Sequence, residues 1–405
     1  MTRSLFLSMT VALCACAGAP RRAGAPAPRG TMSGLDVLVA EGFQRLRGKR
    51  VGVITNRTGV DRRGRSIVEL FAEAPEVTLA AVFTPEHGFA ANTEADRIAS
   101  DRVRIGGRDI PIHSLYAGGI AGMRPKPEQL QGLDVLIFDI QDIGARFYTY
   151  LASMAMGLEE AKAHGVEFMV LDRPNPIRGD ILEGPILDDP SLRFITPTAY
   201  FQVPVRHGLT AGEMALWHNR RVGHSRLTVV KLENWKRSMW HDQTGLPWVP
   251  PSPNIPDLDT AALYSGVGIF ESSNLSVGRG TPSPLSWIGA PWLKAEEIVS
   301  RLQGALDGVQ LSVQSYTPAK NPFQGQECRG VKIAVTDRDM MRPMAVFRHL
   351  ALALRETNPA EFQWQWDGAK RMVGTGDFRL LWETAAGDEA FLNYFDKGPR
   401  EFESA

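Results

Sequence analysis

The sequence predicts an α/β protein in which a domain built on a parallel β-sheet is followed by a smaller α+β domain. From residue 50 onward, short apolar runs alternate with stretches that carry apolar residues at helical spacing, which is the pattern of βαβ units. The apolar runs are continuous, as expected for strands that helices cover on both faces. A length of 405 residues, 43% of them hydrophobic, allows two domains with cores of their own.

The order of the elements follows from these periodicities. We expect strands at residues 51–55, 79–83, 135–140, 167–172, 227–231 and 331–335, and helices at residues 66–74, 148–164, 295–306, 344–356 and 388–395. A further helix should begin after Thr210, because Thr210 and Glu213 have the spacing of a capping box. Prolines in residues 246–256 exclude regular structure, so this segment should be a rigid loop. We place the sheet domain at residues 33–210 and the second domain at residues 211–405.

The N-terminus has the layout of a secretory signal, because Arg3 precedes a short apolar run at residues 4–15. This run is too short for a permanent membrane-spanning helix. The sequence Leu-Cys-Ala-Cys that ends at Cys16 resembles a bacterial lipobox. We therefore interpret residues 1–16 as a lipoprotein signal peptide and Cys16 as the lipid anchor, with Cys14 as the alternative anchor.

Residues 17–32, rich in Ala, Pro, Arg and Gly, should form a flexible tether between the anchor and the folded domains. We expect an exported, periplasmic protein that meets the membrane only through its lipid anchor, with the outer membrane as the expected location. The alternative is a signal peptide that is cleaved after a small residue and releases a soluble protein.

The charge balance and the cysteines exclude several classes of function. Forty-five basic residues balance forty-five acidic ones, and no basic stripe is interleaved with aromatic residues, so we expect no nucleic-acid partner. Cys328 stands alone beyond the signal region, which excludes a disulfide framework. The sequence contains no residue spacing typical of a metal site, so we expect no metal. It also contains no glycine-rich phosphate-binding motif, so we expect no cofactor. A nucleotide-dependent enzyme would need phosphate contacts that the sequence does not offer.

Polar turns follow four of the expected strands, at residues 56–59, 84–88, 141–146 and 173–176. In an open parallel sheet the ligand site lies outside the carboxyl ends of the strands. We therefore expect these four turns to converge on one site.

The turn after the second expected strand, Thr84-Pro-Glu-His-Gly88, carries the first catalytic candidate. Glu86 and His87 stand at the mouth of a strand, where a general acid must meet its substrate. Gly88 permits a tight turn or a close approach of a ligand. The alternative is a surface or helix-capping carboxylate beside a packed histidine.

Three candidates follow the strand at residues 135–140. Asp142 is a second carboxyl group, Arg146 could clamp a planar carboxylate, and Tyr148 offers a sugar-stacking face with a hydroxyl group. The alternative is an internal ion pair between Asp142 and Arg146 that only ties the loop.

Further polar candidates lie in turns and in a glycine-containing run. Those for substrate binding are Asn56, Arg173, Asn175, Glu271, Asn274 and Arg279, and Glu183 is a further catalytic candidate. Arg173, Asn175 and Glu183 are surrounded by rigid prolines, which restrict the backbone around an amide or a charge. Tryptophans flank proline-rich segments and either stack on sugar rings or pack in the core; they are Trp248, Trp287 and Trp292.

Five ordered motifs together resemble one family; they are residues 52–59, 83–89, 139–150, 172–176 and 271–281. They are similar to the motifs of the NamZ/YbbC-like exo-β-N-acetylmuramidases of glycoside hydrolase family 171. The resemblance runs from about residue 34 to the C-terminus. It implies a Rossmann-like N-terminal domain, a smaller second domain, and a cleft between them for a terminal β-1,4-linked N-acetylmuramic acid of peptidoglycan-derived saccharides.

The resemblance also implies a catalytic role for Glu86, which matches the glutamate of the family's Pro-Glu-His-Gly motif. Glycosidases usually pair two carboxyl groups, so Glu183 or Asp142 should be the partner of Glu86. A 2-acetamido sugar could instead use its own carbonyl as the nucleophile. The competing function is a non-catalytic lipoprotein that binds muropeptides or another sugar acid with the same arginines and aromatic residues.

Overall fold

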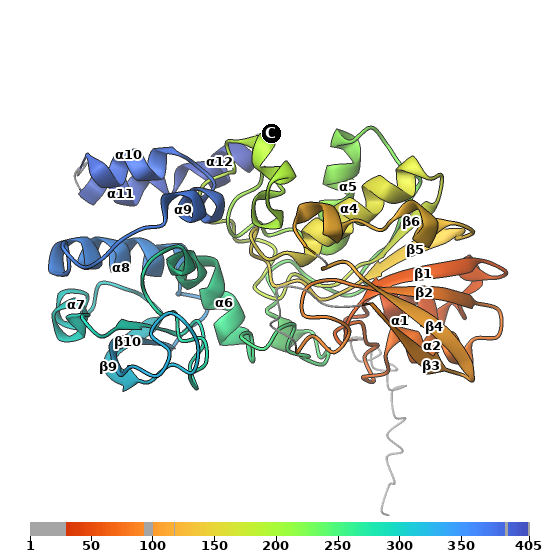
Figure 1. Cartoon of the computed structure of the whole chain (residues 1–405), viewed down its shortest axis with the longest axis horizontal. Helices are drawn as coiled ribbons and strands as arrows, with labels where there is room; N and C mark the ends of the chain where they lie inside the picture. Colours follow the sequence, from red (N-terminus) through yellow and green to blue (C-terminus); the bar gives the residue numbers. More distant parts are fainter. Residues whose placement is uncertain (1–29, 93–99, 117, 385–387, 404–405) are drawn as a thin grey trace, which may run out of the picture.

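The computed structural model describes residues 30–92, 100–116, 118–384 and 388–403 (Figure 1). The expected signal peptide, the cysteines Cys14 and Cys16, and most of the expected tether lie outside the described residues. Within the described residues, no helix combines the length and the hydropathy that are needed to cross a membrane.

The N-terminal domain is built on a seven-stranded sheet with the order β3-β4-β2-β1-β5-β6-β7. Its strands are β1 (Arg50–Thr55), β2 (Thr78–Thr84), β3 (Asp101–Ile105), β4 (Arg108–Ser114), β5 (Val135–Asp139), β6 (Glu167–Leu171) and β7 (Leu227–Val230). All neighbours from β4 to β7 are parallel, and only the edge strand β3 is antiparallel. Because β1 lies between β2 and β5, the loops after β2 and β5 meet above the end of β1.

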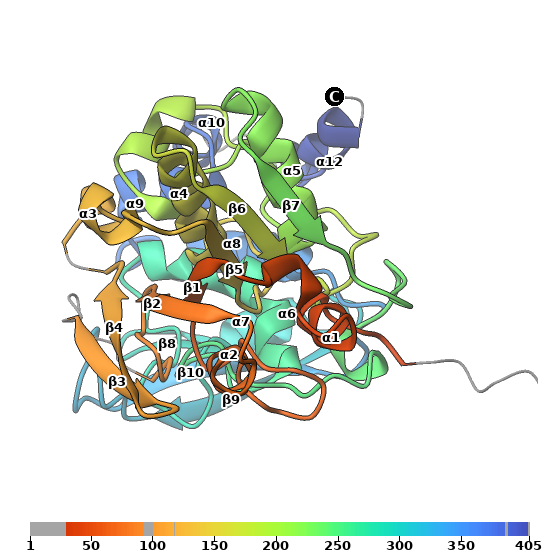
Figure 2. The same cartoon turned by 90° about the vertical axis from the view of Figure 1, so that its right-hand side faces the viewer.

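Helices cover both faces of this sheet, which explains why its strands are continuously apolar. On one face, α1 (Gly34–Ala40) and α2 (Ile67–Glu73) bury their apolar residues against β1, β5 and β6. On the other face lie α4 (Tyr150–Ala163) and α5 (Ala211–Arg221), as Figure 2 shows. The capping box of Thr210 and Glu213 is confirmed at the start of α5. A short helix, α3 (Pro127–Leu130), precedes β5.

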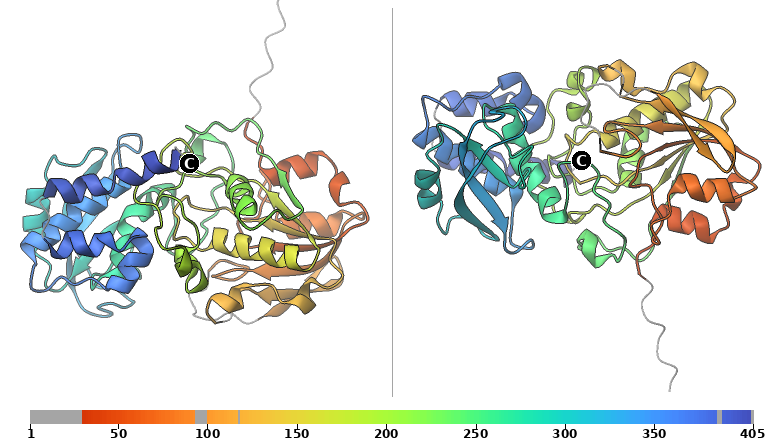
Figure 3. Two further views of the ribbon diagram at one scale, coloured as in Figure 1. Left: turned by 90° about the horizontal axis from the view of Figure 1, so that it is seen from above. Right: turned by 60° about the horizontal axis from the view of Figure 1, so that its bottom comes forward.

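The C-terminal domain packs helices on a small antiparallel sheet of order β8-β10-β9. The strands are β8 (Trp287–Ala290), β9 (Val309–Tyr316) and β10 (Cys328–Val335). The helices are α6 (Leu258–Val267), α7 (Ala295–Arg301), α8 (Pro343–Thr357), α9 (Trp366–Val373), α10 (Asp377–Glu383), α11 (Asp388–Tyr394) and α12 (Lys397–Glu403). The two domains lie side by side (Figure 3).

The predicted fold class is confirmed, but the domain boundary differs from the expected one. Strand β7 pairs with β6 in register from Phe168 opposite Leu227, so the sheet domain continues well beyond residue 210. Helix α6, which packs on α8, is the first element of the second domain. We therefore place the boundary near residue 258, at the end of the proline-rich loop.

Candidate active site

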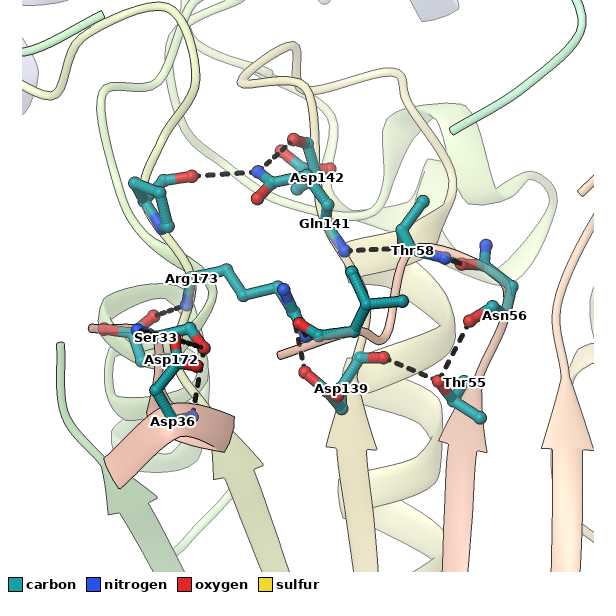
Figure 4. Close-up of polar contacts among 12 residues, drawn as sticks. Ser33, Asp36, Thr55, Asn56, Thr58, Asp139, Gln141, Asp142, Asp172 and Arg173 are labelled. Atoms are coloured by element: carbon teal, nitrogen blue, oxygen red, sulfur yellow. Dashed lines mark hydrogen bonds and ion pairs between the residues drawn. The ribbon is translucent and has the colours of Figure 1, made fainter. Parts of the chain in front are cut away.

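The turns after β1, β5 and β6 lie together at the carboxyl ends of the strands, as predicted, and hydrogen bonds connect them. The hydroxyl of Thr58 accepts a hydrogen bond of 2.9 Å from the Gln141 amide, and Gln141 Nε2 donates to the Pro174 carbonyl at 2.9 Å (Figure 4). Thr55 Oγ1 donates to the Asp139 carbonyl at 2.9 Å. These contacts form a buried polar layer at the carboxyl ends of the strands.

Three of the predicted substrate-binding residues belong to this layer and do not line a large cavity. Asn56 Oδ1 accepts hydrogen bonds from the amide and hydroxyl of Thr58, at 2.9 and 2.6 Å. Arg173 Nε donates to Asp139 Oδ1 at 2.7 Å, and Asn175 Nδ2 donates to the carbonyl of Leu209 at 3.0 Å. All three side chains are buried, so their role in the structure is to hold the turns together.

Arg146 is also buried, and its guanidinium holds three loops. Its NH1 donates to the carbonyls of Pro185 and Val203 at 2.8 and 2.9 Å, and its NH2 donates to the carbonyl of Met372 at 2.8 Å. Burial lowers the pKa of Arg146 to about 9. Arg146 was expected either to clamp a carboxylate of the substrate or to form an ion pair with Asp142. Neither contact is present: the side chain donates to carbonyl groups and not to Asp142. It also does not line the cavity described below.

The two carboxylates expected to assist Glu86 lie elsewhere. Asp142 Oδ2 accepts the amide of Gly144 at 2.7 Å and lies 3.5 Å from Nε2 of His207. Glu183 pairs with Arg206 at 2.7 Å and is buried at the domain junction, where it also accepts the amide of Met344 at 3.3 Å. Neither side chain lines the cavity that holds Glu86.

A cavity of about 310 Å³ lies between the two domains, and we call it the Glu86 cavity. Its lining combines aromatic rings, hydroxyl groups, one amide, one imidazole, two carboxylates and one arginine. The lining residues are Glu86, His87, Tyr116, Phe147, Tyr148, Thr149, Thr198, Ser252, Asn254, Ile255, Tyr264, Glu271, Arg279, Leu285 and Met372. Five predicted site residues therefore meet in one cavity; they are Glu86, His87, Tyr148, Glu271 and Arg279.

Two hydroxyl groups hold the carboxyl group of Glu86, which follows β2 after Pro85. Tyr116 Oη donates to Oε1 at 2.9 Å, and Thr149 Oγ1 donates to Oε2 at 2.6 Å. His87 and Gly88 adopt left-handed backbone angles, with φ of 70° and 72°, which makes the tight turn that presents Glu86. Each carboxyl oxygen is thus fixed by a different loop.

Glu271 and Arg279 enter the cavity from the C-terminal domain as an ion pair. Nε of Arg279 lies 2.5 Å from Oε1 of Glu271, and both side chains are partly exposed. Burial alone would lower the pKa of Arg279, but the negative charges of Glu271 and, more weakly, Glu86 outweigh it and raise that pKa. Arg279 and Glu271 thus share the cavity with Glu86 of the N-terminal domain.

Aromatic rings form an apolar wall of the cavity. The ring of Tyr148 lies 4.8 Å from that of Tyr150 and 6.0 Å from that of Tyr264, and Phe147 packs on Tyr264 at 5.2 Å. Burial raises the pKa of Tyr148, Tyr150 and Tyr264, so all three phenols are neutral at pH 7. Such a wall suits the apolar face of a sugar ring.

Several residues of the cavity were not among the candidates from the sequence. Thr149 lies inside the motif at residues 139–150, and Ser252 and Asn254 lie between prolines of the rigid loop, a signal comparable to that of Asn175. Tyr116 follows β4, a strand that was not predicted. Tyr264 is one apolar residue among many on α6, and no local pattern distinguishes it.

A second hollow of about 750 Å³ adjoins the Glu86 cavity and shares Glu271 and Arg279 with it. It is lined by Glu271, Ser273, Asn274, Leu275, Ser276, Val277, Arg279, Trp292, Asn321, Pro322, Phe323 and Gln365. Asn274 thus lies in this hollow, and its amide binds the backbone of Glu361 and Gln363. Of the three tryptophans, Trp292 lines the second hollow, Trp287 is buried in the core, and Trp248 packs against His241.

Comparison with known proteins identifies the family. The N-terminal model of the exo-β-N-acetylmuramidase NamZ matches residues 51–259, and the C-terminal model matches residues 262–405. The chain is 38% identical over 374 residues to the peptidoglycan β-N-acetylmuramidase NamZ of Bacillus subtilis (strain 168), covering 91% of this chain and 88% of that protein.

Two solved structures of DUF1343 family proteins from Bacteroides fragilis NCTC 9343 are similar over nearly their whole length. One has a TM-score of 0.82 at 32% identity and covers 94% of this chain and 98% of its own. The other has a TM-score of 0.69 at 26% identity and covers 92% of this chain and 96% of its own. The two family models together span both domains described above, and the chain therefore belongs to the exo-β-N-acetylmuramidase NamZ family.

Proposed function

We propose that this protein is an exo-acting glycoside hydrolase that releases β-1,4-linked N-acetylmuramic acid from the non-reducing end of peptidoglycan fragments. The observation that carries the proposal is the carboxyl group of Glu86, held by two hydroxyl groups in a cavity that also contains a second carboxylate and an arginine. A volume of about 310 Å³ suits one amino sugar, as removal of a single terminal residue requires. The relationship to the B. subtilis peptidoglycan β-N-acetylmuramidase supports the same substrate.

In this proposal Glu86 donates the proton to the glycosidic oxygen. Each carboxyl oxygen has two lone-pair positions, so it can accept a hydrogen bond at one of them and carry the transferable proton at the other. Tyr116 and Thr149 can therefore hold Glu86 in the same place before and after the proton is transferred. General acid catalysis requires the carboxyl group of Glu86 to stay in this position, because the proton donor must remain within hydrogen-bond reach of the leaving oxygen.

Glu271 is the second carboxylate of the proposed mechanism, since neither Glu183 nor Asp142 lines the cavity. It forms an ion pair with Arg279, which fixes its position beside the bound sugar. Arg279 is also the guanidinium that can meet the lactyl carboxylate, the group that distinguishes muramic acid from glucosamine. Glu271 assists either as a base or nucleophile, or by orienting the acetamido group of the substrate.

The test is hydrolysis of a chromogenic β-N-acetylmuramide and of the matching β-N-acetylglucosaminide by the purified protein and by Glu86→Gln. We expect the native protein to cleave the muramide only, and Glu86→Gln to lose about a hundred- to ten-thousand-fold in kcat with an unchanged melting temperature. Binding of the muramide without cleavage by the native protein would instead identify a non-catalytic sugar-binding lipoprotein. Near-native turnover by Glu86→Gln would exclude Glu86 as the acid.

We further propose that the protein is exported and anchored to a periplasmic membrane face, with the outer membrane as the proposed location, through a lipid on Cys16. The support is the N-terminal sequence, in which an apolar run and Leu-Cys-Ala-Cys precede a segment rich in Ala and Pro. Such a tether would let the enzyme reach peptidoglycan fragments from the membrane surface.

A further inference from the structure

We infer that Lys332 is a positioning residue for the active site, because it holds the loop that carries Arg279. This inference rests on the proposed function, in which Arg279 meets the lactyl carboxylate of the substrate. We call residues 277–286 the Arg279 loop; it precedes β8 and supplies Arg279 and Leu285 to the lining of the Glu86 cavity. Lys332 lines neither that cavity nor the second hollow, so its effect on the substrate must pass through the loop.

The Arg279 loop is closed by its own backbone. The amide of Leu285 donates to the carbonyl of Val277 at 2.7 Å, and the amide of Thr281 donates to the carbonyl of Gly278 at 3.0 Å. Leu285 has a left-handed backbone conformation, with a φ of 58°. Leucine rarely adopts this conformation, so contacts from the surrounding structure must hold the loop in place.

Lys332 supplies such contacts from β10. Its Nζ donates to Oγ of Ser283 at 2.8 Å and to Oγ of Ser286 at 2.9 Å. The two serines stand on either side of Leu285 in the sequence, so one side chain fixes the loop on both sides of a residue that lines the cavity. Tyr316 Oη of β9 lies 3.1 Å from Ser283 Oγ and extends the chain of hydrogen bonds.

The strand that carries Lys332 is a rigid support. Strand β10 is the central strand of the small sheet, where Lys332 is paired with Trp287 of β8 on one side and with Ser312 of β9 on the other. The neighbours Val331 and Ile333 are buried in the core, and Lys332 projects from the other face of the sheet. A side chain on a central strand can position a loop precisely, because hydrogen bonds on both sides hold its backbone.

The chemistry of Lys332 fits this role better than a general packing role. Its side chain is partly buried, and it forms no ion pair within the part of the chain that the structure describes. Burial lowers the pKa of Lys332, and the charge of Asp257, which lies beyond ion-pair distance, only partly offsets this effect. An apolar residue would fill the same face without this electrostatic cost. What lysine offers is several N–H donors on one atom, which can hold two hydroxyl groups at once.

The path from Lys332 to Arg279 runs through the backbone of the loop. Gly278, which directly precedes Arg279, packs so closely on the carbonyl oxygen of Ser283 that a Cβ atom at Gly278 would clash with it. A shift of Ser283 therefore moves the backbone that carries Arg279. Because small displacements of a binding group weaken the contact it makes, release of Ser283 should weaken the contact of Arg279 with the substrate.

The experiment is a double-mutant cycle on Lys332 and Arg279. The native protein, Lys332→Met, Arg279→Lys and the double variant are compared in hydrolysis of the chromogenic β-N-acetylmuramide. Methionine keeps much of the length of lysine and removes its donors. Lys332→Arg is the conservative variant. Lys49→Met is the matched control, because Lys49 donates to Glu167 at 2.9 Å at the amino ends of β1 and β6, away from the loops of the site.

We expect Lys332→Met to raise KM for the muramide by roughly three- to thirtyfold and to leave kcat within about twofold of native. In the Arg279→Lys background the same change should add little, because the arginine that Lys332 positions is then absent. Lys332→Arg should restore part of the lost affinity, and Lys49→Met should leave KM at its native value. Equal losses in both backgrounds, or no loss in the native background, would overturn the inference.

Failure of the proposed function would show separately, as absence of cleavage of the muramide by the native protein. Hydrogen–deuterium exchange then decides the inference without a substrate. Lys332→Met should speed exchange of the amides of residues 277–286 and leave the exchange of the other segments of the C-terminal domain at native rates. Native exchange rates in the Arg279 loop would overturn the inference. Faster exchange throughout the C-terminal domain would also overturn it, because Lys332 would then stabilise the whole domain and not this loop.

Discussion

The hydroxyl of Thr149 donates a hydrogen bond of 2.6 Å to Oε2 of Glu86, across 63 residues of sequence. Thr149 ends the loop after β5, and Glu86 begins the loop after β2, on the two sides of β1 in the sheet. The topology of the sheet thus brings a hydroxyl group to the proposed catalytic carboxyl group. A second hydroxyl, that of Tyr116, holds the other carboxyl oxygen.

Thr149→Val should lower kcat about ten- to a hundredfold while KM stays nearly constant, because a hydrogen bond to a charged group contributes roughly 1.5–3 kcal/mol. Valine keeps the shape of the side chain and removes only the hydroxyl. Thr149→Ser restores the hydroxyl and should recover most of the activity. Steady-state kinetics on the chromogenic muramide measure both, and a native kcat for Thr149→Val would show that Glu86 needs no support from this loop.

Arg279→Lys should weaken selection of muramic acid over glucosamine. Arginine offers two parallel donors to the lactyl carboxylate, whereas lysine offers a point charge. We expect kcat/KM for muramides to fall by about ten- to a hundredfold. Activity on the analogue that lacks the lactyl group should be low in the native protein and should change little in the variant.

Arg146→Lys is the matched control for this prediction. The guanidinium of Arg146 donates to three backbone carbonyls and does not itself line the cavity, and lysine cannot reproduce all three contacts. We expect a lower melting temperature with an unchanged ratio of muramide to glucosaminide activity. A change in that ratio for Arg146→Lys, or its absence for Arg279→Lys, would contradict the assignment of the carboxylate partner.

Glu159 should make stability depend on pH in the acid range. Burial alone would raise the pKa of Glu159, but hydrogen bonds from His218 and Arg124 and the charge of Arg193 outweigh it and lower the pKa to about 2. Since the folded pKa is lower than the unfolded one, the stabilisation is complete above the unfolded pKa of 4.5 and is lost as pH falls toward 2. The shift corresponds to about 3 kcal/mol.

Melting curves of the native protein and Glu159→Gln test this pH dependence. The native protein should melt at the higher temperature at pH 7, and the difference should shrink between pH 4.5 and pH 2. Glu76→Gln is the control, because Glu76 forms an exposed ion pair with Arg47 and its loss should change the melting temperature little. A constant difference across this pH range would mean that the charge of Glu159 does not stabilise the fold.

Cys16→Ser should abolish incorporation of a fatty-acid probe in metabolic labelling, and Cys14→Ser should retain it. The reason is the position of Cys16 at the end of the Leu-Cys-Ala-Cys sequence, directly before the expected tether. Label that persists in Cys16→Ser and disappears in Cys14→Ser would move the anchor to Cys14. Label absent from the native protein would favour release of a soluble form.

The amino-acid sequence by itself determined the fold class and the four central strands of the sheet domain. Continuous apolar runs marked β1, β2, β5 and β6, since strands buried on both faces need apolar side chains at every position. By contrast, the exposed residues of β3 and the alternating burial of β9 left no continuous run, so these strands were not predicted. The domain boundary was misplaced because β7 had no local signal that joined it to β6.

Only the tertiary structure decided which polar residues share the cavity. Glu86 could be located from its place at the end of a strand, because topology fixes where strand ends lie. Arg146 and Arg279 look alike in sequence, yet Arg146 bonds to a carbonyl 226 residues away whereas Arg279 faces the cavity beside Glu271. A residue's type sets which bonds it can make, but the packing of distant segments sets which partners lie within reach.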